Sequence, residues 1–330
     1  MVNVLVIGGA GYIGAHTCLD LQRNGFTPVV YDNLSNGHRG FAKWGPFEQG
    51  DIRDLGRLTR VFEAYRPCAT IHFAGLIEVG QSIRDPLSFF EINVGGSTAV
   101  LQAADAAGCR NIVFSSTCAT YGTPSATPIS EDHGQLPISP YGRSKLMVED
   151  MLRELCAYRE FATVILRYFN AAGAAPEHGI GEMHDPETHI LPLAIDTALG
   201  LRDRFVVNGC DYDTPDGTCV RDFVHVLDLA DAHTRAVKHL LAGRGASAIN
   251  IGSGVGTSVQ ELLNMVEEVA GRSFRTDRGP RRPGDPPRLV ADNRKARTVL
   301  GWEPRRDLRA IVESAWRWQT GLLKSDAKVA

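Results

Sequence analysis

The sequence predicts an α/β protein with a doubly wound parallel sheet and a smaller, discontinuous C-terminal lobe. Short, nearly continuous apolar runs alternate with segments of helical spacing through the first half of the chain. Such runs are typical of strands buried on both faces, and their alternation with helices gives βαβ units with right-handed crossovers. The length of 330 residues suits one domain of this kind with an added lobe.

The elements are expected in the following order. Apolar runs predict strands at 2–8, 27–32, 69–75, 111–116 and 163–169. Helical spacing predicts helices at 12–25, 55–67, 88–108 and 140–155. After about residue 171 the pattern loosens into a stretch rich in Gly and Pro, followed by shorter elements. We therefore expect a nucleotide-binding domain at 1–170, with 222–252 folding back onto it, and a second lobe made of 171–221 plus 253–330.

Composition excludes several classes of protein. The net charge is −3, from 35 basic and 38 acidic residues, so nothing draws the whole chain to nucleic acid or to a membrane. No apolar run approaches the ~20 residues of a spanning helix, and the first residues lack the pattern of a secretory signal. The seven cysteines form no CxxC pair, which argues against a zinc site and against a disulfide framework. The sequence predicts a reduced, cytoplasmic enzyme without a metal.

A glycine-rich turn follows the first strand. Gly8, Gly11 and Gly14 permit a tight turn, a close approach to pyrophosphate and tight packing of the next helix, whose N-terminus offers N–H donors. Asp32 ends the second strand, where its carboxylate can accept hydrogen bonds from a ribose and would repel a 2′-phosphate. This arrangement predicts NAD rather than NADP, and Arg39 nearby is interpreted as a surface arginine.

Two further strand ends are expected to border the same cofactor. Asp51 and Ile52, after the third strand, are placed to meet the adenine. Phe73, Ala74 and Gly75 end the fourth strand and are placed beside the phosphates and ribose. In a doubly wound sheet the carboxyl ends of the strands converge on the ligand crevice.

A tyrosine and a lysine four residues apart open the helix at 140–155. Tyr141 and Lys145 share one helix face, so the ammonium is expected to lower the phenol pKa and allow proton exchange with a substrate hydroxyl. Thr117 ends the fifth strand and is expected to face Tyr141 across the nicotinamide. Ser115 and Ser116 are interpreted as packing residues of the strand end.

These features resemble a known superfamily. The glycine turn, FSSTCATYG and YGRSK are similar to the extended short-chain dehydrogenase/reductases. The segments AGLIEVGQS, INVGGS, LRYFN, DGTCVRDFVHVLDLADAH and RRPGD narrow the resemblance to the UDP-glucose (UDP-galactose) 4-epimerases. Together these segments span residues 3 to about 292. The resemblance implies a Rossmann domain that binds NAD and a lobe that binds a UDP-sugar.

The resemblance also implies roles for matching positions. NAD-binding positions fall on the glycine turn and on Tyr12, Ile13, Asp32, Asn33, Asn36, Asp51, Ile52, Phe73, Ala74, Gly75, Asn93, Lys145 and Tyr168. The catalytic positions fall on Thr117, Tyr141 and Lys145, of which Lys145 would bind the nicotinamide ribose. Contacts to the sugar nucleotide fall on Thr117, Tyr141, Asn170, His189, Arg221, Arg282, Asp285 and Leu289. For Arg221 the alternative is a salt bridge to the neighbouring Asp222.

Several positions depart from the family pattern. Ile77 stands where many members have Lys, and His189 where Asn often contacts the diphosphate or ribose. Asn208 replaces an aromatic residue expected near uracil, and Leu289 replaces a bulky Tyr that often closes the sugar pocket. Thr117 in place of Ser keeps the hydroxyl. None of these changes removes the groups that transfer the proton or the hydride.

The resemblance implies 4-epimerisation of UDP-glucose and UDP-galactose through a transient 4-keto sugar, with NAD unchanged at the end. Leu289 leaves room for an N-acetyl group, which predicts activity on the N-acetylhexosamine pair as well. A UDP-pentose (UDP-xylose/UDP-arabinose) 4-epimerase uses the same residues and remains the alternative. A 4,6-dehydratase would need an Asp-Glu pair where Cys118 and Ala119 stand. A non-catalytic NAD-binding protein would not need the three catalytic positions together. Family members are often homodimers joined through two helices, here 86–108 and 141–158.

Overall fold

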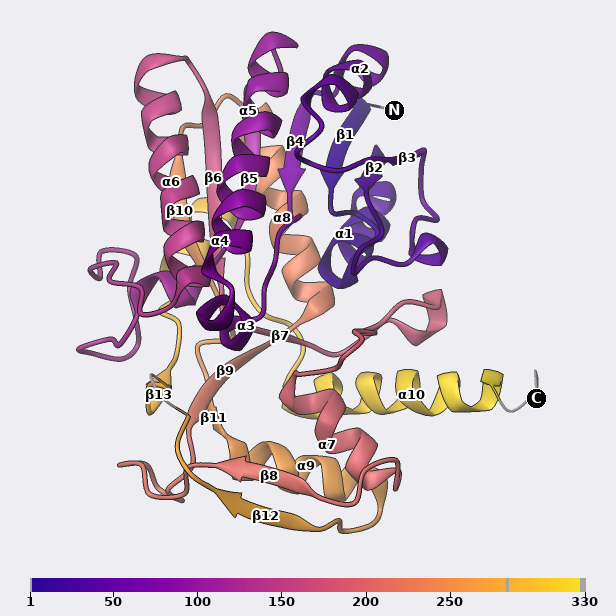
Figure 1. The fold of residues 1–330 in the computed structure, drawn as a ribbon, viewed down its shortest axis with the longest axis vertical. Coiled ribbons are helices and arrows are strands. Elements are labelled where there is room, and N and C mark those ends of the chain that lie inside the picture. The colour runs from indigo at the N-terminus through magenta and orange to yellow at the C-terminus, as the bar shows by residue number, and fades with distance from the viewer. Residues whose placement is uncertain (1, 283–284, 327–330) are drawn as a thin grey trace.

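The larger domain is built on a seven-stranded, all-parallel sheet. The computed structural model describes residues 2–282 and 285–326. The strand order is β10-β6-β5-β4-β1-β2-β3, and every neighbouring pair is parallel. The strands are β1 (Val2–Ile7), β2 (Phe26–Asp32), β3 (Phe47–Gln49), β4 (Ala69–His72), β5 (Asn111–Thr117), β6 (Ala162–Tyr168) and β10 (Ser247–Ile251). The predicted fold class is confirmed (Figure 1).

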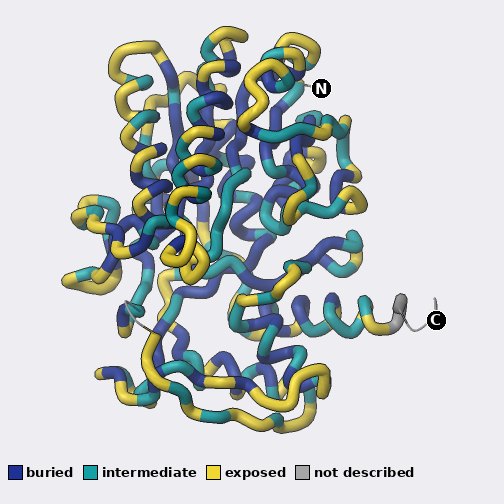
Figure 2. Tube along the Cα trace, viewed as in Figure 1, coloured by how far each residue is buried: buried dark blue, intermediate teal, exposed yellow. Residues whose placement is uncertain are grey.

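Helices cover both faces of this sheet, which explains why the strand sequences are continuously apolar. In β1 the side chains of Val4 and Val6 join one core cluster, whereas Leu5 and Ile7 join the other. The first cluster is completed by α1 (Tyr12–Arg23) and α8 (Val226–Leu241), and the second by α2 (Leu55–Tyr65), α5 (Ser97–Ala106) and α6 (Pro140–Tyr158). Figure 2 shows these buried strands between helices with exposed outer faces.

The helix predicted at 88–108 is divided. It begins with α4 (Pro86–Phe89), passes through a π-helical segment at Phe90–Gly96 and continues as α5. A Cβ on Gly96 would lie 2.4 Å from Cδ1 of Ile52, so this part of the helix packs closely on the loop after β3. The short helix α3 (Val79–Arg84) precedes it.

The smaller lobe has two sheets of its own. In the first, β9 (Val220–His225) pairs with β7 (Asn170–Ala172), β11 (Gly256–Ser258) and β13 (Arg288–Leu289). In the second, β8 (Phe205–Asn208) pairs with β12 (Thr276–Gly279). The helices α7 (Ile190–Ala198), α9 (Val259–Ala270) and α10 (Leu308–Asp326) belong to this part, and α10 points away from the molecule toward the C-terminus (Figure 1).

The chain crosses between the two parts more than once. Residues 222–225 were expected to fold back onto the larger domain, but they lie in β9, whose pairing partners all belong to the lobe. The return to the larger domain begins at α8 and ends with β10 beside β6. Within the described residues, no helix is long and apolar enough to cross a membrane.

Candidate active site

The turn between β1 and α1 has the geometry of a phosphate cradle. Gly8 adopts φ +82°, and a Cβ on Gly14 would lie 2.2 Å from the carbonyl oxygen of Gly8, so the helix packs directly on the turn. Gly11 is the N-cap of α1, and no side chain caps this end and no acidic residue occupies its first turn. Its backbone N–H groups and the positive end of the helix dipole therefore suit a diphosphate. Tyr12 and Ile13 begin the helix, and the Tyr12 hydroxyl donates to the carbonyl of Gly173 at 2.6 Å.

A buried carboxylate stands at the end of β2. Asp32 is only 8% exposed, and its two oxygens accept hydrogen bonds from the backbone N–H groups of Ala10 (3.0 Å) and Leu34 (2.8 Å). Burial raises the pKa of Asp32, and these two hydrogen bonds oppose that shift. Each carboxylate oxygen retains a lone pair for a ribose hydroxyl. The turn and this carboxylate fit the adenosine diphosphate part of NAD.

The loops after β2 and β3 meet at the adenine end. Asn33 donates to the Asp51 carboxylate at 3.2 Å, and Arg53 forms an ion pair with the same carboxylate at 2.9 Å. Hydrogen bonds from Arg53 are the main reason that the pKa of Asp51 falls to about 2. Ile52 is buried beside them, whereas Asn36 lies exposed on its loop. These residues lie on one edge of the sheet.

Asn93 ties the loop after β4 to α6. Its Oδ1 accepts from the backbone N–H of Leu76 at 2.7 Å, and its Nδ2 donates to the Leu76 carbonyl and to the Ser144 hydroxyl, each at 3.0 Å. Gly75 passes so close that a Cβ there would lie 2.8 Å from Asn93 Oδ1. Asn93 thus supports the strand end at 73–75, and both hydrogens of its amide nitrogen are donated within the protein.

The three predicted catalytic residues converge where β5 ends. Ser139 caps α6 by accepting from Gly142 N–H at 3.1 Å, and this cap fixes the start of the helix that carries Tyr141. Lys145 is buried and donates from Nζ to the Ser115 carbonyl at 3.1 Å. Thr117, the last residue of β5, hydrogen-bonds to Tyr141.

The protein alone does not lower the pKa of Tyr141. Burial raises that pKa well above its ordinary value, and the neighbouring Tyr168 raises it further, while the hydrogen bond with Thr117 lowers it. Burial also lowers the pKa of Lys145 to about 8, although Glu149 opposes this shift. The causes of this shift do not include Lys145, so the activation of the phenol by Lys145 stays a prediction. Burial dominates in the chain by itself, and a further positive charge would favour the phenolate.

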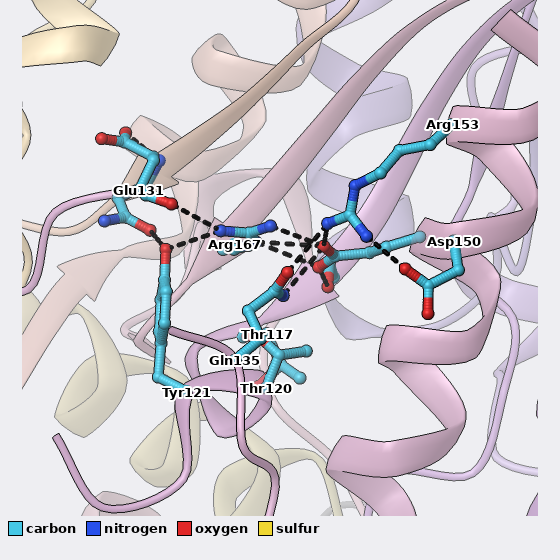
Figure 3. Close-up of polar contacts among 11 residues, drawn as sticks. Thr117, Thr120, Tyr121, Glu131, Gln135, Asp150, Arg153 and Arg167 are labelled. Atoms are coloured by element: carbon cyan, nitrogen blue, oxygen red, sulfur yellow. Dashed lines mark hydrogen bonds and ion pairs between the residues drawn. The ribbon is translucent and has the colours of Figure 1, made fainter. Parts of the chain in front are cut away.

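A buried charge network lies behind the catalytic residues, and the sequence patterns do not indicate it. Glu149, one helical turn after Lys145, forms an ion pair with Arg167 of β6 at 2.6 Å and accepts from the Ser116 hydroxyl at 2.5 Å. Arg167 also donates to the Tyr121 hydroxyl at 2.9 Å (Figure 3). The network joins α6, β5 and β6 behind the site. In sequence, an acidic residue four positions after a lysine is typical of an exposed helix face.

Two residues predicted to bind the sugar nucleotide contact each other. Arg221 forms an ion pair with Asp285, and its Nη1 donates to the Val220 carbonyl at 2.8 Å. The alternative pairing of Arg221 with Asp222 does not occur. Asp222 is buried and accepts from backbone N–H groups of Ser253, Gly254 and Ala291.

Beside this pair lies a cavity of about 580 Å³, lined in part by Arg282, Asp285 and Tyr212. The Asn208 amide, oriented with its oxygen toward Arg282, accepts from Nε and Nη2 at 3.2 Å each. Asn208 thus orients an arginine at the cavity, a contact that an aromatic residue could not make.

The remaining predicted substrate positions lie on β7, on β13 and at the start of α7. Asn170 begins β7 and is partly exposed. Leu289 is half-buried against a cluster that contains Phe169 and Cys118. Cys118 is the residue that follows Thr117 in the chain. His189 occupies the N-cap position of α7 without a capping hydrogen bond from its side chain, and its Nδ1 lies at Glu182 (2.9 Å) and Glu187 (3.0 Å).

The chain and its fold have close counterparts among known proteins. Residues 4–252 match the model of the NAD dependent epimerase/dehydratase family. A UDP-glucose 4-epimerase of Rhizobium leguminosarum bv. trifolii is 59% identical over 316 residues, covering 96% of this chain and 97% of that protein.

Two solved structures extend the likeness to the fold. A UDP-glucose 4-epimerase from Brucella ovis in complex with NAD superposes with a TM-score of 0.94 at 48% identity, covering 96% of this chain and 98% of that one. A second, from Stenotrophomonas maltophila with bound NAD and formylated UDP-arabinopyranose, gives 0.95 at 38% identity, covering 98% and 100%. The chain therefore belongs to the NAD dependent epimerase/dehydratase family, and within it to the NAD-using UDP-glucose 4-epimerases of the extended short-chain dehydrogenase/reductases.

Proposed function

We propose that this enzyme interconverts UDP-glucose and UDP-galactose at C4 through a transient 4-keto sugar. The observation that carries the proposal is the convergence of Tyr141, Thr117 and Lys145 at the carboxyl end of β5. A phenol, a hydroxyl and an ammonium within one buried site suit the removal and return of a proton on a sugar hydroxyl.

The chain's own residues handle the proton and hold the sugar. Bound NAD supplies a hydride acceptor for the sugar C4 and, when oxidised, a positive charge on the nicotinamide ring. Tyr141, as the phenolate, accepts the O4 proton as the C4–H bond breaks with its electron pair, which leaves a ketone at C4. Thr117 shares that proton through its hydrogen bond with Tyr141. When the sugar presents its other face, Tyr141 returns the proton to O4 and C4 regains its hydrogen.

The nucleotide end must stay fixed while the sugar turns. Arg221 and Arg282 provide planar donor groups for the diphosphate, and Asp285 provides acceptors for the uridine ribose. Because Arg221 and Asp285 are paired with each other, the groups proposed to bind the diphosphate and the ribose are held side by side before the nucleotide binds. Asn170 is proposed to bind the same nucleotide, from the start of β7.

The range of sugars depends on the space beside Leu289. We propose that Leu289 of β13, which packs against the cluster containing Cys118, leaves space beside the sugar that an aromatic ring would fill, so that the N-acetylhexosamine pair is also converted. A UDP-pentose remains the second candidate substrate, because the Stenotrophomonas relative was solved with formylated UDP-arabinopyranose.

The proposal is tested by incubating the purified protein with UDP-galactose and following UDP-glucose by NMR. Tyr141→Phe should retain NAD and lose roughly 10²- to 10⁴-fold in rate, the usual contribution of a positioned acid–base group. Tyr158→Phe, an exposed tyrosine of the same helix, is the control and should keep its rate. Normal turnover by Tyr141→Phe, or no conversion of UDP-galactose by the wild type, would refute the proposal.

We also propose that the enzyme is a homodimer. Ile83 of α3, Leu87 of α4 and Met147 of α6 are exposed, at 60%, 78% and 41%, on helices that contact one another. Burial of such a patch in a second copy would stabilise the pair. Light scattering should give twice the chain mass for the wild type and a smaller mass for Leu87→Glu; a monomeric wild type would contradict the dimer.

A further inference from the structure

Two histidines and two glutamates gather in the segment that leads into α7. His189 Nδ1 lies 2.9 Å from Glu182 Oε1 and 3.0 Å from Glu187 Oε1. His184 Nδ1 lies 3.4 Å from Glu182 Oε1 and 3.7 Å from Glu187 Oε2. One nitrogen or oxygen from each residue falls within 4.8 Å of the others. We call these four residues the His–Glu cluster.

We propose that the His–Glu cluster binds a divalent cation of the zinc class. In a tetrahedral site with metal–ligand distances near 2.0–2.1 Å, neighbouring ligand atoms are about 3.3 Å apart. With one ligand atom from each residue, the His189–Glu182, His189–Glu187 and His184–Glu182 distances of 2.9, 3.0 and 3.4 Å lie near that value, and His184 Nδ1 is 3.7 Å from the other oxygen of Glu187. Two imidazoles with two carboxylates are a donor set that suits zinc better than magnesium or calcium, which prefer oxygen alone.

The ligand atoms are not all satisfied by the protein. His184 Nδ1 is buried and makes no hydrogen bond of good geometry, and its neighbours are the carboxylates of Glu182 at 3.4 Å and of Glu187 at 3.7 Å. A buried polar nitrogen without a well-formed hydrogen bond is costly, and a cation at the centre of the cluster would use it as a ligand.

The surrounding structure holds the ligands in position. The Trp318 Nε1–H donates to the Glu182 carbonyl at 2.8 Å, and His38 Nε2 hydrogen-bonds to the Met183 carbonyl at 2.7 Å. Glu187 is fixed from within its own loop, since its Oε1 accepts from the backbone N–H groups of Thr188 and His189, each at 2.7 Å. Such outer contacts orient metal ligands and strengthen binding.

The place of the cluster indicates what the cation would do. The ring of His184 lies edge-on to that of Tyr12, 6.4 Å between centroids, at the first turn of α1. Trp318 belongs to α10, and His189 begins α7. Because all four ligands come from residues 182–189, a cation here would fix the conformation of this segment, which Tyr12 and Trp318 contact from α1 and α10. Its contribution would be to stability, and neither the proton transfer nor the hydride transfer requires it.

Metal binding by the full-length protein, with NAD bound, tests the proposal. After treatment with a chelator, titration with Zn²⁺ should give one equivalent per chain by calorimetry and a raised melting temperature. Co²⁺ in the same site should give the intense visible bands of a four-coordinate ion. His184→Gln and Glu187→Gln should each weaken binding at least about 10-fold. Retention of NAD checks that each variant is folded.

His178→Gln is the matched control, because His178 also lies near a glutamate, Glu177 at 3.8 Å, but outside the cluster. It should bind zinc as the wild type does. Absence of stoichiometric binding by the wild type would overturn the proposal. So would zinc binding that persists unchanged in both cluster variants, or that His178→Gln weakens as much as they do.

Discussion

Arg221 and Asp285 form an ion pair across the lobe, although they are 64 positions apart in sequence and each was assigned to a different part of the nucleotide. The pair places a guanidinium beside the cavity before any anion arrives. Its guanidinium is mostly buried, with 11% of the Arg221 side chain exposed, so an arriving diphosphate meets a cation that is already desolvated.

Removal of that guanidinium should weaken nucleotide binding more than it slows chemistry. For Arg221→Met we expect UDP to bind about 10- to 100-fold more weakly, because hydrogen bonds to charged groups contribute about 1.5–3 kcal/mol. Calorimetry with UDP measures this directly. Arg281→Met is the control, since Arg281 lines the same cavity but is exposed and paired with Asp211. Equal losses of UDP affinity in both variants would contradict a specific role for Arg221 in binding the diphosphate.

The buried network behind β5 should control stability. Glu149→Gln leaves Arg167 buried beside an uncharged partner, which should lower the free energy of unfolding by about 3–5 kcal/mol. Glu149→Leu combined with Arg167→Met should recover much of that loss. Asp150→Asn, an exposed neighbour on the same helix, should change stability little. Denaturant unfolding measures all three, and a double variant no better than Glu149→Gln would contradict this account.

Buried neutral histidines should make the protein sensitive to acid. Burial lowers the pKa of His72 to about 3 and that of His233 to about 4, from an ordinary 6.5. As the pH falls below 6.5, each of these rings binds a proton in the unfolded chain but not in the folded chain. The free energy of unfolding therefore falls by about 1.4 kcal/mol per pH unit for each ring. Above pH 6.5 these two rings cause no loss of stability, and the loss they cause grows as the pH falls toward 3–4.

His72→Gln should make this slope shallower by about 1.4 kcal/mol per unit between roughly pH 6 and pH 4.5. Chemical denaturation at several pH values measures the slope. His133→Gln, which changes a ring that is only half-buried, serves as the control. A slope that does not change in His72→Gln would be evidence against a buried neutral ring.

A ring at position 289 should narrow the range of substrates. The wild type should convert UDP-N-acetylglucosamine as well as UDP-glucose, because Leu289 is shorter than a tyrosine beside the sugar. Leu289→Tyr should abolish the N-acetylated activity and largely spare the other, since the added ring removes space while the catalytic groups stay in place. Comparison of both substrates on both proteins decides the matter. The idea fails if the wild type has no N-acetyl activity, or if the variant loses both activities equally.

Local patterns were sufficient to predict the large sheet and the cofactor turn. The run Val4–Ile7 is buried on two faces, and the glycine spacing that follows it requires a close helix. Asp32 could be placed because it ends a strand. In each case the neighbours in space are also neighbours in the sequence pattern, so periodicity and turn chemistry carry the information.

Contacts between distant segments could not be predicted in this way. The partner of Arg221 lies on another loop, and the burial of Glu149 depends on Arg167, which comes from the next strand. Helical spacing predicts a lysine near the phenol of Tyr141, but it cannot predict the burial that raises the pKa of that phenol. The His–Glu cluster lies in an aperiodic loop without cysteines, so no CxxC pair marks it in the sequence.

In the proposed reaction, the hydrogen at C4 leaves the sugar and returns to the same carbon, while Tyr141 takes up and returns the O4 proton. NMR tests this on the products formed from UDP-galactose that carries deuterium at C4, incubated with the purified enzyme in ordinary water. We expect UDP-glucose that keeps its deuterium at C4, and we expect Tyr141→Phe to form it far more slowly. Loss of the deuterium to solvent during conversion, or a failure to form UDP-glucose at all, would contradict it.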